Sequence, residues 1–143
     1  MTEKISGRIR VVVADDSEAM RRAVSRLLSV QFDVVGEAGD GKSALDAVAA
    51  LQPDVAIVDI LMPVMDGIQF ARRIRATRSG CKVVILTGME ERDYILAALS
   101  AGASGFVFKR RMTVDLIYAT HEVLAGRVFV STDRSSGPDS PLT

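Results

Sequence analysis

Residues 53–67, PDVAIVDILMPVMDG, decide the fold of this chain, because four apolar residues in a row end in the carboxylate of Asp59. Three other runs have the same layout: VVVADD at 11–16, VVILT at 83–87 and FVFK at 106–109. Runs that are apolar throughout, without alternation of apolar and polar residues, are typical of strands buried on both faces of a parallel sheet. The sequence therefore predicts a buried parallel sheet whose strands end in polar side chains.

Helical patterns separate these runs along the chain. We predict strands at 11–14, 34–35, 55–58, 83–86 and 106–108, and helices at 17–28, 43–51, 66–76, 91–101 and 113–125. This alternation predicts an α/β fold, a doubly wound, five-stranded parallel sheet with helices on both faces. Ser17 is a capping residue type, Asp66 precedes Gln69 with the spacing of a capping box, and Thr113 with Asp115 repeats this pattern.

Length and composition limit the class of protein. The chain has 143 residues, of which 48% are hydrophobic and 25% charged, and this predicts one globular domain. Eighteen basic residues balance eighteen acidic ones, so no net charge attracts the chain to nucleic acid or to an anionic membrane. No apolar run approaches the ~20 residues that span a bilayer, and the first residues lack a signal-peptide core. We therefore expect a cytoplasmic protein with no membrane partner.

The composition changes near the end of the chain. We place the domain at residues 1–130, because the sequence that follows, STDRSSGPDSPLT, has almost no apolar residue to offset its ordering entropy. Residues 131–143 are expected to form a flexible tail. No output domain follows within the chain, so we expect no direct DNA binding by it.

The polar residues at the strand ends form the candidate site. In an open parallel sheet the carboxyl ends of the strands meet at one edge, where ligands bind. Asp15, Asp16 and Asp59 would repel one another there unless a cation lay between them, and their hard oxygen ligands favour Mg²⁺. A carboxylate beside Mg²⁺ can be the nucleophile toward a phosphoryl group. The Thr87 hydroxyl and the Lys109 ammonium would assist by positioning and by neutralising charge.

Four motifs in combination, VVVADDSEAM, PDVAIVDILMPVMDG, KVVILTG and AGASGFVFK, resemble the response-regulator receiver domain, the CheY-like phosphoacceptor module of two-component signalling. The resemblance extends from Arg8 to about Val130. It implies a (βα)5 flavodoxin-like fold with strand order 2-1-3-4-5, and a histidine kinase or phosphotransfer protein as the phosphodonor. GEAGDG, ALSAGASG and EVLAGR resemble most closely the receivers that precede LuxR-type helix-turn-helix output domains.

The resemblance implies a role for each residue at this edge. Asp59 would be the phosphorylated residue, Asp16 a direct Mg²⁺ ligand, and Asp15 a ligand chiefly through water. The backbone carbonyl of Leu61 would complete the protein ligands of the metal. Lys109 would pair with the phosphoryl group once it is transferred.

The resemblance also implies a conformational switch. Thr87 would turn toward the phosphoryl group and Phe106 would follow into the space that it leaves. The switch would change the face made by the fourth helix, the fifth strand and the fifth helix. Tyr94, Leu99, Phe106 and Val107 make this face a candidate site for a partner or for a phosphorylation-linked homodimer.

Three positions depart from the pattern of the family. Phe106 stands where Tyr is commoner, so the switch aromatic has no hydroxyl. Lys109 is followed by Arg110 where many receivers have Pro. Leu61 and Met89 occupy the two positions that flank the attacking water, and neither side chain can polarise it. We therefore predict slow self-dephosphorylation and no other enzymatic activity.

Other functions remain open from the residues alone. Residues 36–43, GEAGDGKS, satisfy the P-loop pattern of an NTPase, although Glu37 and Asp40 would place carboxylates against the nucleotide phosphates. A phosphatase that used Asp59 would need a general acid, which no strand end offers. A pseudo-receiver that binds partners without phosphate would not need the complete set of site residues. Cys81 is expected to pack as a small apolar residue.

Overall fold

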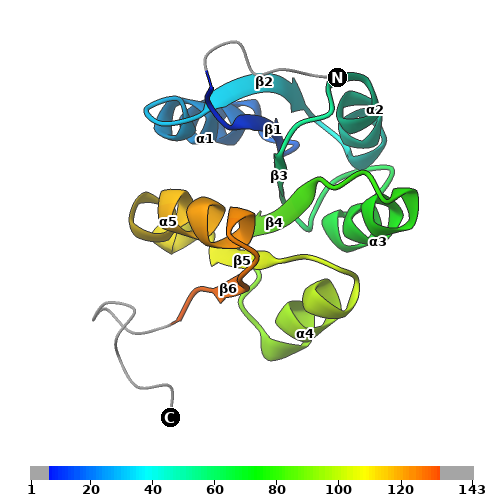
Figure 1. Ribbon diagram of the computed structural model, residues 1–143. Helices are drawn as coiled ribbons and strands as arrows, with labels where there is room; N and C mark the ends of the chain where they lie inside the picture. The colour runs from blue at the N-terminus through cyan, green and yellow to red at the C-terminus, as the bar shows by residue number, and fades with distance from the viewer. Residues whose placement is uncertain (1–6, 133–143) are drawn as a thin grey trace.

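The computed structural model describes residues 7–132 and shows a sheet with helices on both faces (Figure 1). The strands are β1 (Arg10–Ala14), β2 (Asp33–Ala38), β3 (Val55–Val58), β4 (Lys82–Thr87), β5 (Gly105–Phe108) and β6 (Phe129–Val130). The helices are α1 (Glu18–Leu28), α2 (Gly41–Leu51), α3 (Gly67–Thr77), α4 (Arg92–Ser100) and α5 (Met112–Leu124), and a 3₁₀ turn, η1 (Lys109–Arg111), leads into α5. The alternation of strand and helix confirms the predicted α/β class.

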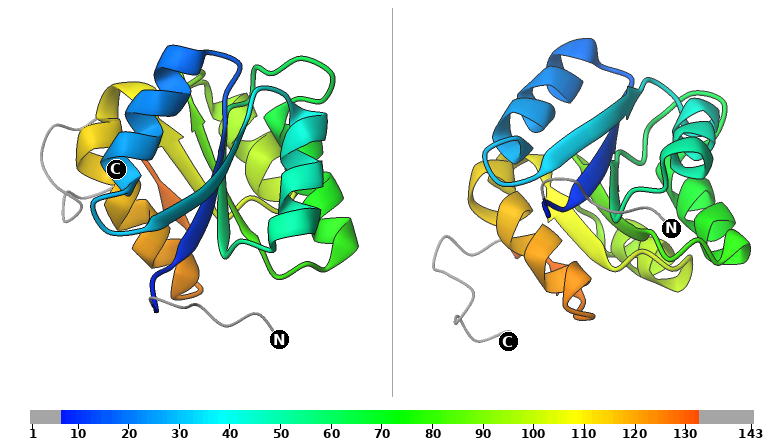
Figure 2. Two further views of the ribbon diagram at one scale, coloured as in Figure 1. Left: turned by 90° about the horizontal axis from the view of Figure 1, so that it is seen from above. Right: turned by 45° about the horizontal axis from the view of Figure 1, so that its top comes forward.

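The sheet is parallel throughout, with strand order β2-β1-β3-β4-β5-β6. The predicted order 2-1-3-4-5 is therefore confirmed. All five predicted strands are present, and a short sixth strand, β6, extends the sheet beyond β5. In Figure 2, α1 and α5 cover one face of the sheet, and α2, α3 and α4 cover the other.

The core consists of two apolar layers, one on each face of the sheet. Val55 and Ile57 of β3 pack in the layer beneath α1 and α5, whereas Ala56 and Val58 pack in the layer beneath α2, α3 and α4. All four residues are at most 1% exposed. Burial on both faces explains why the run is apolar at every position. A polar side chain is accommodated only where the strand ends, at Asp59.

Two of the three predicted helix starts are confirmed. The Ser17 hydroxyl accepts a hydrogen bond from the Met20 N–H at 3.2 Å, and Asp66 with Gln69 forms a reciprocal capping box. The predicted pattern at the start of α5 is wrong: the helix begins at Met112, and no side chain caps it. Asp115 is instead 7% exposed and takes part in a buried network, described below.

The two edge strands differ from the prediction. Strand β2 covers Asp33–Ala38, not only residues 34–35, because a half-exposed edge strand accepts Gly36 and Glu37 without an apolar run. Strand β6 was not predicted, since two residues are too few for a periodic pattern. It pairs Phe129 with Gly105 and Val130 with Phe106.

The folded part extends beyond the predicted domain boundary. Ser131, which we expected to be the first residue of a flexible tail, is only 4% exposed, and its N–H donates to the Phe106 carbonyl at 2.9 Å. Hydrogen bonds hold Ser131 there, next to Phe129 and Val130, which pack against the core. Residues 133–143 of the predicted tail lie outside the described residues. Among residues 7–132, no helix is both long and apolar enough to cross a membrane.

Candidate functional site

Four of the predicted site residues lie at the carboxyl ends of four neighbouring strands. Asp15 follows β1, Asp59 follows β3, Thr87 is the last residue of β4, and Lys109 follows β5. The Lys109 Nζ lies 2.9 Å from Asp15 Oδ2 and 2.8 Å from Asp59 Oδ2. The two aspartate side chains are 5% and 6% exposed, and that of Lys109 is 23% exposed. The structure thus brings two buried carboxylates onto one ammonium group.

Every polar atom of Asp15 has a partner, and these partners come from different parts of the chain. Its N–H donates to the Ala38 carbonyl at 3.0 Å, and its own carbonyl accepts from Arg21 Nη1 at 2.8 Å. Its Oδ1 accepts from the Ser17 N–H at 2.9 Å, while Oδ2 meets Lys109. The carboxylate therefore has one oxygen held by the loop and one that faces the site.

Asp59 is held in a similar way. Its N–H donates to the Ala14 carbonyl at 3.1 Å, and its Oδ1 accepts from the Leu61 N–H at 3.4 Å. Oδ2 faces Lys109. Gly67 lies close behind, since a Cβ on this residue would approach the Asp59 carbonyl oxygen to 2.2 Å. Only glycine at the start of α3 leaves space for the main chain of Asp59.

The electrostatics of the site keep Lys109 charged. Burial lowers the pKa of this ammonium, but its hydrogen bonds to Asp59 and Asp15 and the charges of both carboxylates raise the pKa by more, so the net shift is upward. One ammonium cannot neutralise two carboxylates, and Asp16 adds a third at the exposed rim. The site therefore has an excess of negative charge that favours a further cation.

The predicted Mg²⁺ ligands are only partly assembled. Among residues 7–132, no group of three or more His, Cys, Asp or Glu side chains is arranged to hold a metal ion. The reason is that Lys109 lies between the carboxylates of Asp15 and Asp59. The donor set nevertheless fits Mg²⁺, because it consists of carboxylate and carbonyl oxygens alone, and two of the carboxylates are buried and share one positive charge.

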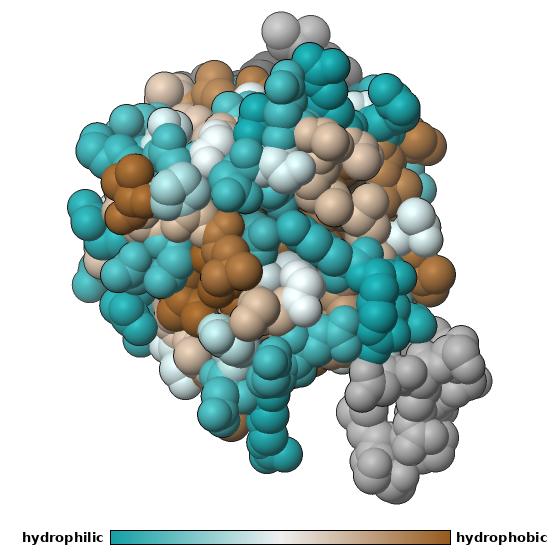
Figure 3. Space-filling view, turned by 180° about the vertical axis from the view of Figure 1, so that it is seen from behind, coloured by the Kyte–Doolittle hydropathy of each residue, from teal (hydrophilic) through white to brown (hydrophobic). Residues whose placement is uncertain are grey.

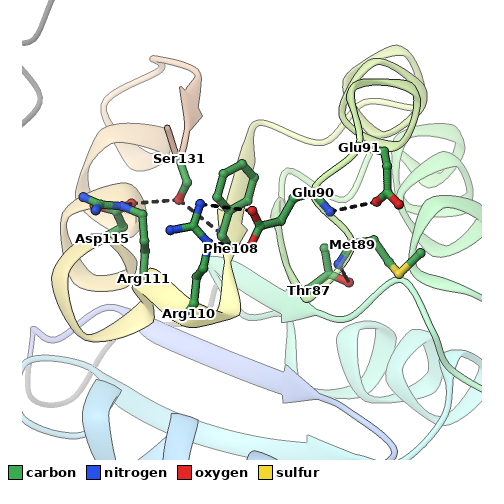
Figure 4. A network of polar contacts seen from close by, with 9 residues as sticks. All are labelled: Thr87, Met89, Glu90, Glu91, Phe108, Arg110, Arg111, Asp115 and Ser131. Atoms are coloured by element: carbon green, nitrogen blue, oxygen red, sulfur yellow. Dashed lines mark hydrogen bonds and ion pairs between the residues drawn. The ribbon is translucent and has the colours of Figure 1, made fainter. Parts of the chain in front are cut away.

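The predicted switch residues are both fully buried, at 0% exposure. The Thr87 Oγ1 accepts from the Met89 N–H at 3.3 Å, a contact seen in Figure 4. In the sheet Thr87 pairs with Phe108, whereas Phe106 pairs with Ile85. Phe106 lies edge-on to Phe108, with ring centroids 6.2 Å apart. The two switch residues are thus neighbours on adjacent strands without being directly opposite.

The expected docking face needs correction. Phe106 and Val107 are both 0% exposed, and β6 pairs with β5 on the side where the face was predicted. Strand β5 is therefore covered. Of the four apolar residues assigned to this face, Tyr94 and Leu99 on α4 are the two that remain partly exposed.

Apolar side chains also lie near the candidate site. Figure 3 views the molecule from the side toward which the strands direct their carboxyl ends, and it shows apolar groups among polar ones. In the loop between β3 and α3, Leu61 is 57% and Val64 is 80% exposed. Val64 has φ of 71°, a conformation that β-branched residues rarely adopt. Leu61, two residues after Asp59, thus offers no polar side chain to water at the site.

Sequence reasoning missed one residue that supports the site. Arg21 was not predicted to contact it, yet its Nη1 donates to the Asp15 carbonyl at 2.8 Å and its Nε lies 3.6 Å from Glu37. The signal in the sequence is weak, because Glu18 lies three residues before Arg21 and four before Arg22, and it pairs with Arg22.

The geometry excludes the P-loop alternative. Asp40 caps α2, and its two carboxylate oxygens accept from the Ser43 N–H at 2.7 Å and from the Ser43 hydroxyl at 3.0 Å. The helix N-terminus that would have to hold phosphates is therefore already filled by a carboxylate. A Cβ on Gly41 would lie 2.0 Å from the Met65 carbonyl oxygen, so the loop between β3 and α3 packs against this turn.

Comparisons with known proteins agree with this arrangement. Residues 11–121 match the family model described as the response regulator receiver domain. The regulatory protein NarL of Mycobacterium tuberculosis is 36% identical over 132 residues, which cover 91% of this chain and 61% of that protein. A protein-glutamate methylesterase/protein-glutamine glutaminase of Nocardioides sp. is 48% identical over 105 residues, 71% of this chain and 29% of that protein.

Solved structures show the same fold. A two-component response regulator of the LuxR family from Aurantimonas sp. SI85-9A1 matches with a TM-score of 0.84 and 31% identity, over 89% of this chain and 92% of that one. The chain spans 61% of the length of NarL, so the match concerns one part of such regulators. Because the family model extends over most of the fold, including all four strand ends that build the site, the chain belongs to the response regulator receiver domain family.

Proposed function

We propose that this receiver accepts a phosphoryl group onto Asp59 from a phosphohistidine in a histidine kinase or a phosphotransfer protein. The observation that carries the proposal is the bridge that Lys109 makes between Asp15 and Asp59 at 2.9 and 2.8 Å. A buried carboxylate oxygen is thereby directed to the open edge of the sheet with a cation beside it. Transfer of a phosphoryl group requires mainly in-line positioning and neutralisation of charge.

Mg²⁺ would be held by Asp15, Asp16 and Asp59 and by the Leu61 carbonyl. When bound, it would supply charge neutralisation for the phosphoryl oxygens. The residues of the chain carry out the transfer itself. Asp59 Oδ2 attacks phosphorus, the bond from phosphorus to the donor nitrogen breaks, and its electrons remain on the imidazole. The Lys109 ammonium pairs with the phosphoryl oxygens.

The signal would then pass through the switch. The Thr87 hydroxyl accepts from the Met89 N–H but still has its own hydrogen to donate to a phosphoryl oxygen. Movement of Thr87 frees space beside β5, into which Phe106 can turn. The surfaces of α4 and α5, with β6 beside them, would carry the change to a partner or to a second copy of the chain. All helices of the described part pack on the receiver sheet, so we place the contacts of this chain with proteins, not DNA.

The phosphorylated form should be long-lived. Water attacking the aspartyl phosphate would pass between Leu61, which is 57% exposed, and Met89. Neither side chain can orient or deprotonate water. The receiver would therefore act as a phosphoacceptor, with slow self-dephosphorylation as its only turnover.

Intact-protein mass after incubation with acetyl phosphate tests the proposal. The expected result is one added phosphoryl group that requires Mg²⁺, is lost in the presence of a chelator and is absent in Asp59→Asn. Asp46→Asn is the matched control, since Asp46 is an exposed aspartate on α2 that pairs with Lys42 at 3.5 Å. Addition to Asp59→Asn at the rate of the unsubstituted chain would overturn the assignment of Asp59.

A further inference from the structure

Three consecutive cations form the 3₁₀ turn η1, and each reaches a different part of the molecule. Lys109 bridges Asp15 and Asp59 in the candidate site. Arg110 pairs with Glu90 in the loop that follows β4. Arg111 pairs with Asp115 on α5. A turn of three residues thus joins the phosphoacceptor, the loop after Thr87 and the last helix.

The contact of Arg110 is bidentate and stacked. Its Nε and Nη2 lie 2.8 and 3.0 Å from the two carboxylate oxygens of Glu90, and its guanidinium lies 5.3 Å from the centre of the Phe108 ring. A fork of this kind fixes direction as well as distance. Glu90 lies three residues after Thr87, so the pair ties η1 to the loop that the switch would move (Figure 4).

The contact of Arg111 leads to the last strand. Its Nε and Nη2 donate to the two oxygens of Asp115 at 2.9 and 3.3 Å. The Ser131 hydroxyl donates to Asp115 Oδ2 at 2.7 Å and accepts from the Phe108 N–H at 3.1 Å. Asp115 and Ser131 are 7% and 4% exposed. The network is therefore buried, and it connects β5, η1, α5 and the residue after β6.

The residues after Lys109 do not restrict the backbone by themselves. A Pro ring at that point would restrict it, but none is present there. Here Arg110 follows Lys109, and Arg110 and Arg111 have ordinary backbone freedom. Two charged anchors directly after Lys109 replace that restriction, because each fixes η1 against a separate element.

We propose that Arg110 and Arg111 are positioning residues for Lys109, and that Ser131 extends this control to the segment following β6. Removal of the Arg111–Asp115–Ser131 contacts frees the end of η1, so Lys109 spends less time where it can meet a phosphoryl oxygen. The inference rests on the proposed function of Asp59. It adds that the hold of Lys109 on the phosphoryl group depends on the position of the C-terminal strand.

Two probes separate positioning of Lys109 from general damage to the site. Mg²⁺ alone reports on the aspartates, and beryllofluoride at saturating Mg²⁺ stands in for the phosphoryl group and reports on Lys109 as well. Both dissociation constants are measured by isothermal titration calorimetry on the full chain. For Arg111→Met and Ser131→Ala we expect beryllofluoride binding to weaken roughly fivefold, the size of coupling between residues in one network. Mg²⁺ binding should stay within about twofold of the unsubstituted chain.

A matched control exists at the other end of the same helix. Arg127, in the turn after α5, makes a bidentate pair with Glu122 of α5 at 2.9 Å for both contacts, and this pair is more exposed than that of Arg111. Arg127→Met should leave both dissociation constants unchanged. Urea unfolding of each variant shows that the protein is folded at the temperature of the titration. If Arg111→Met does not fold, Ser131→Ala still tests the proposal, because it removes only one hydroxyl of the same network.

The deciding comparison uses Lys109→Met. If Arg111 acts through Lys109, then adding Arg111→Met to Lys109→Met changes beryllofluoride binding no further. An equal loss in both backgrounds would overturn the proposal, and so would unchanged binding in Arg111→Met and Ser131→Ala. Failure of the unsubstituted chain to bind beryllofluoride with Mg²⁺ would instead contradict the proposed function itself. The two failures are thus distinguishable.

Discussion

The two ends of the sheet carry charged residues of different character. At the carboxyl end, Asp15, Asp59 and Lys109 are mutually paired and largely buried. At the amino end, a cavity of about 190 Å³ lies between the end of α3 and the starts of β4 and β5, with Arg75, Lys82 and Cys81 among its lining residues. The residues that line this cavity include cations but no carboxylate, so opposing charges are not brought together there.

The comparison shows what makes an end of this sheet reactive. At the amino end, the Arg75 side chain donates a hydrogen bond to the Ser100 carbonyl at the end of α4, at 2.8 Å. Burial, reinforced by the charge of Asp54, raises the pKa of the Cys81 thiol to about 12, so it stays protonated. At the carboxyl end the charges are instead paired, and each of two buried carboxylates directs an oxygen at the Lys109 ammonium. Buried charges that are paired with one another therefore distinguish the candidate site from the amino end.

The largest effect is expected from alanine at two glycines, one at each end. Gly67→Ala places a Cβ 2.2 Å from the Asp59 carbonyl oxygen, and we expect a loss of about 3 kcal/mol in unfolding free energy, with displacement of Asp59. Gly80 has φ of +81° but nothing within 4 Å of its added Cβ. Gly80→Ala should cost only about 1 kcal/mol, from backbone strain. Urea unfolding compares them, and equal losses would contradict the crowding that we assign to the carboxyl end.

A smaller effect is expected from removing one lysine at each end. Lys109→Met leaves two buried carboxylates without their cation, and we expect a loss of about 2 kcal/mol at pH 7, less than for a fully buried pair because this side chain is 23% exposed. Lys82→Met should change stability by less than about 0.5 kcal/mol.

Addition of Mg²⁺ sharpens this comparison. A divalent cation would replace the missing charge, so the stability of Lys109→Met should rise with Mg²⁺ more than that of the unsubstituted chain, as measured by thermal unfolding. An equal rise in thermal stability with Mg²⁺ in both proteins would show that the aspartates do not bind the cation.

The stability that Lys109 contributes should depend on pH in a defined direction. Its pKa is raised in the folded state, because hydrogen bonds and charges from Asp59 and Asp15 outweigh the effect of burial. The folded state therefore binds the proton more tightly, and the contribution is complete below the ordinary lysine value of 10.5. It is lost as pH rises above 10.5 through the folded pKa. The difference in unfolding free energy between the unsubstituted chain and Lys109→Met should then shrink, whereas a constant difference up to strongly alkaline pH would contradict the pairing.

The sequence predicted what burial and topology determine. The run Val55–Val58 could only be a covered strand, and parallel strands bring their carboxyl ends together, so Asp15, Asp59, Thr87 and Lys109 could be placed at one edge. Long apolar runs and cap spacings are local signals of this kind.

The prediction failed where single polar contacts determine structure. Strand β6 is two residues long and has no periodic pattern, and the Ser131 hydroxyl that follows it lies between Asp115 and the Phe108 N–H. A serine in a sequence does not reveal whether it is buried or solvated until its partners are known. For the same reason Asp115 was interpreted as part of a helix-start pattern.

The smallest expected effect concerns the thiol at the amino end. Because the pKa of Cys81 rises from 9.0 to about 12 on folding, the unfolded chain loses this proton first. Stability from the neutral thiol is complete below pH 9.0 and declines as pH rises toward the folded value, by about 1 kcal/mol at pH 10. Cys81→Ala has no such decline, so the difference in unfolding free energy between the two proteins should fall from pH 7 to pH 10.

Lys109 and the tyrosines are common to both proteins, so their titration cancels in the difference. Urea unfolding at the two pH values gives the difference directly. The same difference at both would mean that Cys81 titrates at its ordinary pKa in the folded chain. The amino end would then carry an ionisable thiol, and the contrast between a reactive and an inert end of the sheet would no longer hold.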